Sequence, residues 1–134
     1  MTVRELIFES VTTDPVLQVL GFDEDHVFTD HSLDTPQVRP LIVLRWQNVV
    51  VGLGSVNQRI LQVWVHDQPA DYERIDQTLK RLRTLLGSIE AVRIDGGAAG
   101  LHTVIWEGES DDLRDVEVGT ITRWAQFRLT GSAF

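Results

Sequence analysis

The chain has 134 residues, 43% of them hydrophobic, and it contains no cysteine. This length and composition fit one domain with its own core and disfavour disorder, while the missing cysteine excludes disulfides and thiolate metal sites. Twenty acidic and twelve basic residues leave a net charge of −8, which repels a phosphate backbone and disfavours ordinary nucleic-acid binding. No stretch reaches the roughly 20 apolar residues of a membrane span, and the start of the chain lacks a signal-peptide run, so we expect synthesis in the cytosol.

The N-terminal region predicts two helices. Thr2 and Glu5 have the spacing of a capping box, and apolar residues recur after them at helical spacing. Asp14 followed by Pro15 is typical of the start of a helix, and this second helix is short because Gly21 is a natural stop.

Alternating and β-branched residues then predict three strands. These are residues 26–29, 41–46 and 59–66, with an irregular loop over residues 30–40, where two prolines fall. Both faces of the third strand are partly apolar, so we expect one face to pack on helices and the other to meet a second subunit or a loop. The first face carries Leu61, Val63 and Val65, and the second carries Ile60, Gln62, Trp64 and His66.

The best-marked element is a helix over about residues 69–86. Acidic residues fill its first turns and basic residues its later ones, which suits the helix dipole. We expect Gly87 to end it. Its apolar stripe has spacings of three and four residues and consists of Tyr72, Ile75, Leu79, Leu82 and Leu86.

The last third of the chain predicts strands at residues 90–94, 101–107 and 120–130. With no internal repeat or linker, residues 1–134 form a single expected domain. The fold class that we predict is α/β in the α+β sense, with one mainly antiparallel sheet on which an N-terminal helix and a long amphipathic helix pack. Four tryptophans fall in predicted strands, where they fit either the core or a sheet face that meets a large partner: Trp46, Trp64, Trp106 and Trp124.

No cluster of side chains in the sequence marks a catalytic or metal site. His26 and His31 flank a boundary between strand and loop, and His66 and His102 fall on separate strands. None of them has the i,i+4 spacing, with a nearby Glu, of a zinc-binding helix. The glycines of residues 96–100 lack the spacing of a phosphate-binding loop, and no serine stands in a Gly-x-Ser-x-Gly elbow. We therefore assign no catalytic residue, no cofactor and no metal, and we expect a protein that is not an enzyme.

Two segments are strongly acidic. Residues 23–34 hold five acidic residues and no base, and residues 107–117 hold six against Arg114 alone. The simplest interpretation is a pair of solvated loops. Calcium binding by the second segment is a weaker alternative, because the ligand order of an EF-hand is missing. The acidic residues that we single out are Asp23, Glu24, Asp25, Glu109, Asp111 and Asp112.

The segment from Asn48 to Asn57 is long for a hairpin turn and apolar for an exposed loop. Two interpretations keep its side chains out of water. Residues 49–51 could lengthen the strand from Leu41 and pack on the core of the same subunit, or the segment could reach a neighbouring subunit or another protein. We favour the second interpretation, and the candidate interface residues are Val49, Val50, Val51, Leu53 and Val56.

The order of these elements resembles the tail-terminator (tail-completion) proteins of long-tailed bacteriophages. The short helix over residues 14–21, between an N-terminal helix and a strand, is similar to the opening of that family, and residues 39–46 are similar to its proline-then-strand segment. The closest match is residues 60–86, where a strand ending in Trp-x-His leads into a long amphipathic helix. Residues 112–129 resemble its closing acidic loop and long strand, whereas residues 48–57 depart from the pattern.

The resemblance implies a subunit that forms a cyclic oligomer, typically a hexamer, on the head-proximal end of the tail tube. Such a ring stops polymerisation of the tube and gives the head–tail connector protein its docking surface. The implied partners are other copies of the chain, the major tail-tube protein and the connector, with no membrane. Genomic DNA passes through without specific binding, so we expect at least one acidic segment to face the channel. The implied location is the virion tail, after assembly in the host cytoplasm.

Two other functions stay open. A head-completion protein or connector adaptor of the phage neck would share the size and acidity but would bind on the portal side. A small ligand-binding or enzymatic α/β domain would show polar residues that converge on one pocket. Mass in solution, alone and with tail-tube protein, separates these classes.

Overall fold

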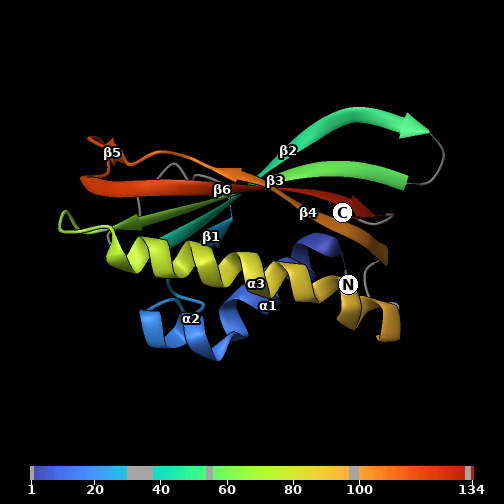
Figure 1. Cartoon of the computed structure of the whole chain (residues 1–134), viewed down its shortest axis with the longest axis horizontal. Helices are drawn as coiled ribbons and strands as arrows, with labels where there is room; N and C mark the ends of the chain where they lie inside the picture. The colour runs from blue at the N-terminus through green and yellow to red at the C-terminus, as the bar shows by residue number, and fades with distance from the viewer. Residues whose placement is uncertain (1, 30–37, 54–55, 97–99, 132–133) are drawn as a thin grey trace.

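Three helices lie on one side of a six-stranded sheet (Figure 1). The computed structural model describes residues 2–29, 38–53, 56–96, 100–131 and 134, and it describes the backbone but not the side chains of residues 49–53, 56–57 and 89–96. The predicted α+β fold class is confirmed. In chain order the elements are α1 (Val3–Thr13), α2 (Pro15–Leu20), β1 (Val27–Thr29), β2 (Leu41–Leu53), β3 (Val56–Asp67), α3 (Glu73–Gly96), β4 (Leu101–Glu109), β5 (Leu113–Asp115) and β6 (Thr120–Gly131).

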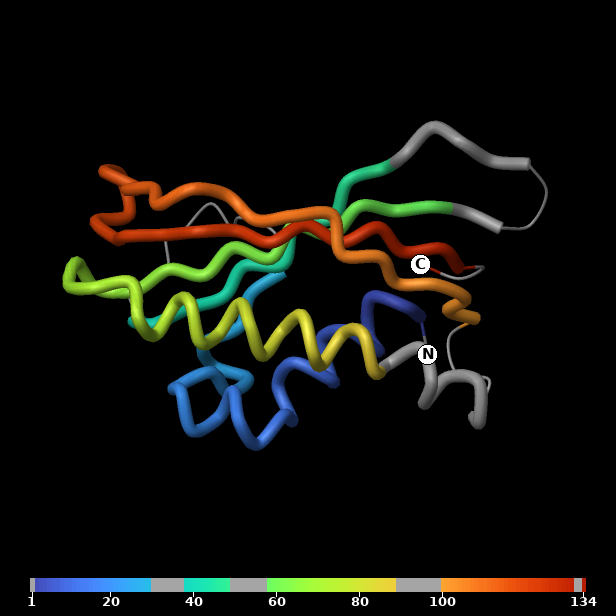
Figure 2. The backbone as a smooth tube through the Cα atoms, in the orientation of Figure 1, coloured from blue at the N-terminus to red at the C-terminus, as the bar shows by residue number. Residues whose placement is uncertain are grey.

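The sheet has the strand order β1-β2-β3-β6-β4, and β5 pairs with the first three residues of β6. Only β1 and β2 run parallel, so the sheet is mainly antiparallel, as the sequence predicts. Strand β5 was not expected, because it lies in the acidic segment that we interpreted as a loop. The start of α1 and the end of β6 lie at the same end of the molecule (Figure 2).

Local signals in the sequence place the first two helices correctly. The hydroxyl of Thr2 accepts a hydrogen bond from the amide of Glu5 at 3.2 Å, and the carboxylate of Glu5 accepts one from the amide of Thr2 at 3.1 Å. The carboxylate of Asp14 accepts from the amide of Leu17 at 3.1 Å and caps α2. Gly21 ends that helix with a φ of 107°, a left-handed conformation that favours glycine.

Helix α3 differs from the prediction at both ends. It begins at Glu73, because the carboxylate of Asp71 accepts the amide hydrogen bond of that residue at 3.0 Å. It then runs through Gly87 and through the expected strand at residues 90–94. A glycine ends a helix when it adopts the left-handed conformation of Gly21, and Gly87 stays in the helix instead. Short runs such as residues 90–94 are ambiguous between helix and strand on sequence alone.

The described part of the segment from residue 48 to 57 is strand, which agrees at the backbone with the interpretation that residues 49–51 lengthen the strand from Leu41. Strand β2 continues to Leu53, β3 starts at Val56, and the two strands pair with a bulge between Asn48 and Gly52. The β-branched residues of this segment favour an extended backbone, which accounts for strand structure up to Leu53 and again from Val56.

The main core lies between the helices and the sheet face that they cover. The predicted stripe on α3 is buried at Ile75, Leu79, Leu82 and Leu86, and it meets the face of β3 that carries Leu61, Val63 and Val65. Tyr72 precedes the helix, and its hydroxyl donates to the carbonyl of Leu113 at 2.9 Å. Within the described residues, none of the helices is both long enough and apolar enough to cross a membrane. The buried hydrophobic residues of β6 are Ile121, Ala125, Phe127 and Leu129.

Candidate assembly surfaces

The face of the sheet opposite the helices, here called the outer face, carries an aromatic group at its centre. Trp64 of β3 pairs directly with Trp124 of β6, and their ring centroids lie 6.2 Å apart. The ring of His66 stacks on Trp64 with the centroids 6.3 Å apart, and the guanidinium of Arg45 lies 5.8 Å from the Trp64 centroid. Both tryptophans are only half-buried. They hold each other in place and still offer surface to a partner.

A chain of hydrogen bonds continues along the outer face next to the tryptophans. The amide of Gln62 donates to the side-chain oxygen of Gln126 at 3.0 Å, and Gln126 donates to the carboxylate of Glu107 at 3.1 Å. Arg128 donates to the same carboxylate at 3.0 Å. The hydrogen bond from Gln126, followed by that from Arg128, holds the pKa of Glu107 below its usual range. Glu107 is thus an ordered part of strand β4 and not a free charge of a loop.

The outer face is buried at the end of the sheet where β1 and β5 lie. Leu41 and Val43 are nearly inaccessible there, and the Nδ1 atom of the buried His66 lies 2.8 Å from the hydroxyl of Thr120. The hydroxyl of Thr122 donates to the carbonyl of Val65 at 2.8 Å. The accessible part of the outer face therefore lies towards the β2–β3 hairpin.

The first acidic set, Asp23, Glu24 and Asp25, forms an exposed turn between α2 and β1. Asp23 accepts a hydrogen bond from the amide of Asp25 at 3.0 Å, and its carboxylate lies 2.7 Å from the Nδ1 atom of His26. The hydrogen bond with His26 is the main cause that lowers the pKa of Asp23. The remaining acids of this segment, at positions 30 and 34, lie outside the described residues.

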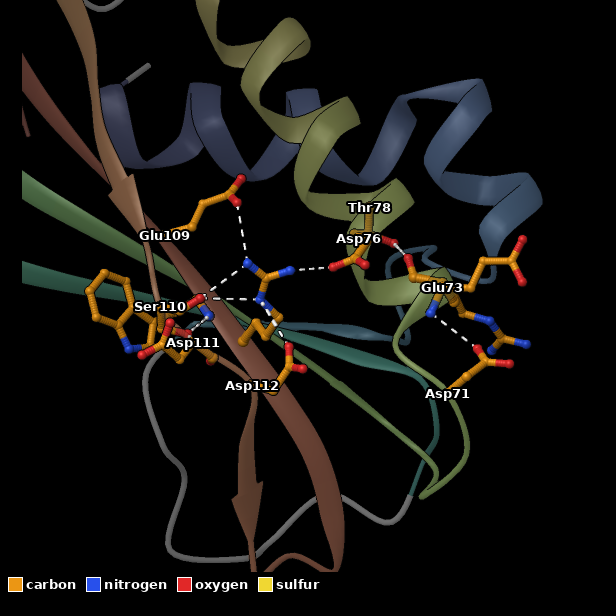
Figure 3. A network of polar contacts seen from close by, with 11 residues as sticks. Asp71, Glu73, Asp76, Thr78, Glu109, Ser110, Asp111 and Asp112 are labelled. Atoms are coloured by element: carbon orange, nitrogen blue, oxygen red, sulfur yellow. Dashed lines mark hydrogen bonds and ion pairs between the residues drawn. The ribbon is translucent and has the colours of Figure 1, made fainter.

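The second acidic set gathers around one arginine (Figure 3). The guanidinium of Arg123 forms ion pairs with Asp76 of α3, with Glu109 at 3.5 Å and with Asp112 at 3.6 Å. It also donates to the carbonyl of Ser110 at 3.1 Å. This grouping could not be predicted from the sequence, because Arg123 lies on another strand and Asp76 on a helix. The arginine offsets part of the negative charge, and Asp111 lies exposed beside it.

The two acidic sets lie at opposite edges of the sheet. Residues 23–25 lead into β1, which is the first strand of the sheet, and residues 109–112 lie at the end of β4, which is the last. The fold therefore does not bring them together into one site. Which of them faces a channel stays a prediction.

The candidate interface residues of the hairpin all lie in strands. The backbone of Val49, Val50, Val51 and Leu53 belongs to β2, and that of Val56 belongs to β3. Their side chains lie outside the described residues, so the choice between core and interface also stays a prediction.

The surface hollows among the described residues include a polar one and a mostly apolar one. One of about 500 Å³ is polar and lies at the start of α3, where Arg74 forms an ion pair with Asp67 at 3.6 Å. The other, of about 420 Å³, is mostly apolar and lies between α1 and the first two strands. Its lining residues are Arg4, Glu5, Phe8, Thr29 and Trp46.

The described histidines and carboxylates are scattered, and no group of three or more among them is arranged to hold a metal ion. His66 is buried, His26 is half-buried beside Asp23, and His102 is exposed on β4. His31 lies outside the described residues. Comparison of the sequence with protein-family models gave no match, and neither did comparison with curated proteins.

Proposed function

We propose that the chain is a structural protein of a phage tail. Its copies form a cyclic oligomer, typically of six, that caps the head-proximal end of the tail tube and stops its polymerisation. The surface of the ring that faces the head is the docking site of the head–tail connector. Support comes from the order of elements on which the resemblance rests, since an N-terminal helix, a short second helix, a first strand, a strand that leads into a long helix and a closing long strand occur in the fold in that order.

The β2–β3 hairpin is the observation that carries the self-association in this proposal. Half of the residues from Asn48 to Asn57 are Val or Leu, and the described backbone of this segment, residues 48–53 and 56–57, lies in two paired strands. From Arg45 onwards, β2 has β3 as its only neighbouring strand in the described part of the chain. An apolar strand at the edge of a sheet promotes aggregation unless another chain covers it.

The free energy gained by burying side chains of the hairpin is large enough to drive assembly. Burial of two Val or Leu side chains stabilises a contact by about 3–6 kcal/mol before the cost of ordering the segment. A ring repeats the same contact at every subunit boundary, so this contribution is multiplied around the ring.

The excess of acidic residues agrees with a ring that lets DNA slide through. At least one of the two acidic sets faces the channel in this proposal, where like charge prevents the phosphate backbone from binding. A view of the assembled ring with both sets on its outer rim would refute this part of the proposal.

Substitution of two hairpin residues tests the proposal. The double variant Val50→Asp with Leu53→Asp is compared with Val19→Asp plus Val116→Asp, which makes the same charge change at residues that are 88% and 91% exposed. We expect both variants to keep the unfolding transition of the parent in circular dichroism. Only the hairpin variant should lose ring formation in light scattering and the capping of purified tail tubes in electron microscopy.

Two outcomes contradict this expectation in different ways. If the isolated hairpin variant unfolds, the segment belongs to the core of its own subunit. If the parent protein binds portal-side particles and not tube ends, the chain is instead a head-completion protein or connector adaptor.

A further inference from the structure

We propose that copies of the chain join edge to edge, with β2 of one copy paired antiparallel to β4 of the next. The inference rests on the proposed ring and names the contact that builds it. It follows from the register of the sheet, which leaves two long edges at the same end of the molecule without a neighbouring strand among the described residues.

The two edges are free over most of their length. Strand β1 lies beside β2 only as far as the pair Thr29 and Leu44, so β2 from Arg45 to Leu53 has a neighbour on one side only, as far as the described residues go. Strand β4 is the last strand at the opposite edge, with β6 on one side. The short strands β1 and β5 flank the other half of the sheet.

The free edges also lie at the same height along the strands. Trp46 of β2 pairs with Leu61 of β3, which pairs with Phe127 of β6, and Phe127 pairs with Trp106 of β4. Trp46 is therefore level with Trp106, which means that the two residues occupy the same position along the strand direction. In the same way, Asn48 is level with Val104. A closed ring needs rotation without translation, so two edges at equal height can meet when the ring axis runs along the strands. Edges at different heights would build an open helix under the same rotation.

The strand directions fit as well. From β2 through β3 and β6 to β4 every pairing is antiparallel, so β2 and β4 run in opposite directions. Rotation about an axis along the strands keeps each direction unchanged. The neighbour's β4 therefore arrives antiparallel to β2, which is the slightly more stable ladder.

Charge complementarity identifies a second copy as the partner. Arg45 is level with Gln126 and Gly108, so it would lie beside Glu107 of the adjacent copy. Both side chains belong to the outer face, where Arg45 lies near Trp64 and Glu107 bonds to Gln126. Pairing of β2 with another β2 would leave Glu107 without this partner, and it would stop at a dimer.

The backbone of β4 is regular between its two bulges, and a strand of another copy can pair with it there. Register shifts at Leu101–Thr103 and Trp106–Gly108 distort the ends of the strand, and such bulges protect an edge from unwanted pairing. The regular stretch between them includes Ile105, which is 54% exposed and level with Gln47 of β2. The bulges thus limit the available register to one short stretch.

Disulfide cross-linking tests the pairing cleanly, because the chain contains no cysteine. Gln47→Cys and Ile105→Cys are introduced into one chain, where β3 and β6 separate the two positions by about 14 Å, too far for a bond within a copy. Directly opposed residues of paired strands have Cβ atoms about 4.5–5.5 Å apart, so a small adjustment brings their sulfurs within bonding distance. After mild oxidation at a concentration that gives rings, we expect a denaturing gel without reductant to show a ladder longer than dimers.

The single variants and a mass measurement make each outcome decisive. Either single variant should stay monomeric on the gel, and a dimer from Gln47→Cys alone would overturn the proposal in favour of β2–β2 pairing. Rings by light scattering without a ladder refute the edge pairing and leave the proposed function standing. A ladder from a protein that does not cap tail tubes refutes the proposed function instead. A chain that is monomeric at every concentration and on tail tubes refutes both.

Charge reversal provides a second test. Arg45→Glu and Glu107→Arg each place like charges at the contact, so each variant alone should assemble about tenfold less well or worse. An equimolar mixture of the two restores opposite charges at every boundary of an even-numbered ring and should recover assembly. Mixing cannot repair a folding defect within a chain, so a mixture that stays unassembled counts against the pairing, provided that each variant keeps the parent's unfolding transition.

Discussion

The two faces of the sheet use their tryptophans in different ways. On the face that the helices cover, Trp46 and Trp106 pack against the apolar core, and each lies near a cation from a helix, Arg4 at 5.5 Å and Arg83 at 3.8 Å from the ring centroid. On the outer face, Trp64 and Trp124 contact each other and adjoin hydrogen-bonded glutamines. The covered face therefore depends on the helices, whereas the outer face is ordered by contacts within the sheet itself.

This difference separates folding from assembly. Apolar burial dominates stability, so the covered face should determine whether the subunit folds. A face that is ordered by its own cross-strand contacts can remain accessible without a covering helix. Its residues are then available to determine what the folded subunit joins, and substitutions on the two faces should have effects of different size.

The largest expected effect comes from two adjacent residues of β6. Phe127 is 1% exposed in the core, and Gln126 lies on the outer face. Phe127→Ala should reduce the free energy of unfolding by about 3–5 kcal/mol because it leaves a cavity. Gln126→Ala should cost about 1–2 kcal/mol, the net contribution of the two side-chain hydrogen bonds that Gln126 makes. Urea denaturation measures both values, and equal losses would contradict the division between the faces.

A smaller effect is expected from the ion pair within the helix layer. Arg81 of α3 donates two hydrogen bonds, of 3.0 and 2.6 Å, to Asp14, whose side chain is 3% exposed. Asp14→Asn keeps an oxygen that can cap α2 but removes the charge, so it should cost roughly 1–2 kcal/mol at neutral pH.

The same pair predicts a dependence on pH. The hydrogen bond from Arg81 is the main cause that holds the pKa of Asp14 below its ordinary value of 3.8. Because the folded-state pKa is the lower one, this stabilisation is fully present above the ordinary value and is lost as the pH falls through the folded-state value. The parent protein should therefore lose more stability than Asp14→Asn when denaturation is repeated below pH 4. Parallel acid profiles for the two proteins would show that the pair contributes nothing.

The parts of the fold that depend on neighbouring residues could be predicted from the sequence. Caps at Thr2 and Asp14, the stop at Gly21 and the stripe of α3 each involve residues within one or two helical turns. The pairing of β3 with β6 could not be predicted, because the long helix and two further strands lie between residues 57–67 and residues 121–131 in the chain. Sequence periodicity identifies strands but does not determine their order.

The candidate surfaces show the same limit. The apolar hairpin and the acidic sets were recognisable as local runs in the sequence. Their partners were not recognisable, since Arg123 reaches Asp76, 47 residues away, and Gln62 reaches Gln126, 64 residues away. The two free edges became visible only through the register of the whole sheet.

The ion pairs around Arg123 should contribute less than the pair in the helix layer. Asp76 and Asp112 are 55% and 61% exposed, so water and salt screen their attraction to the guanidinium. Arg123→Gln should reduce the free energy of unfolding by up to about 1 kcal/mol at low ionic strength, and by less in high salt. Denaturation at two salt concentrations measures this difference. A loss that is large and independent of salt would show that this end of the sheet is held as firmly as the core.

The smallest expected effect lies on the side of α3 that faces away from the sheet. Gly87 is exposed within the helix, its φ is not positive, and a methyl group added there would meet no atom within 4 Å. Glycine in a helix interior is less favourable than alanine because it loses more backbone freedom on folding. Gly87→Ala should therefore raise the free energy of unfolding by about 0.5 kcal/mol and leave assembly unchanged. The matched control is Gly21→Ala, which should destabilise the protein because Gly21 has a φ of 107° and lies against Pro40. Destabilisation by Gly87→Ala in thermal denaturation would show that the helix ends near Gly87, as the sequence alone predicts, and that α3 does not continue past it.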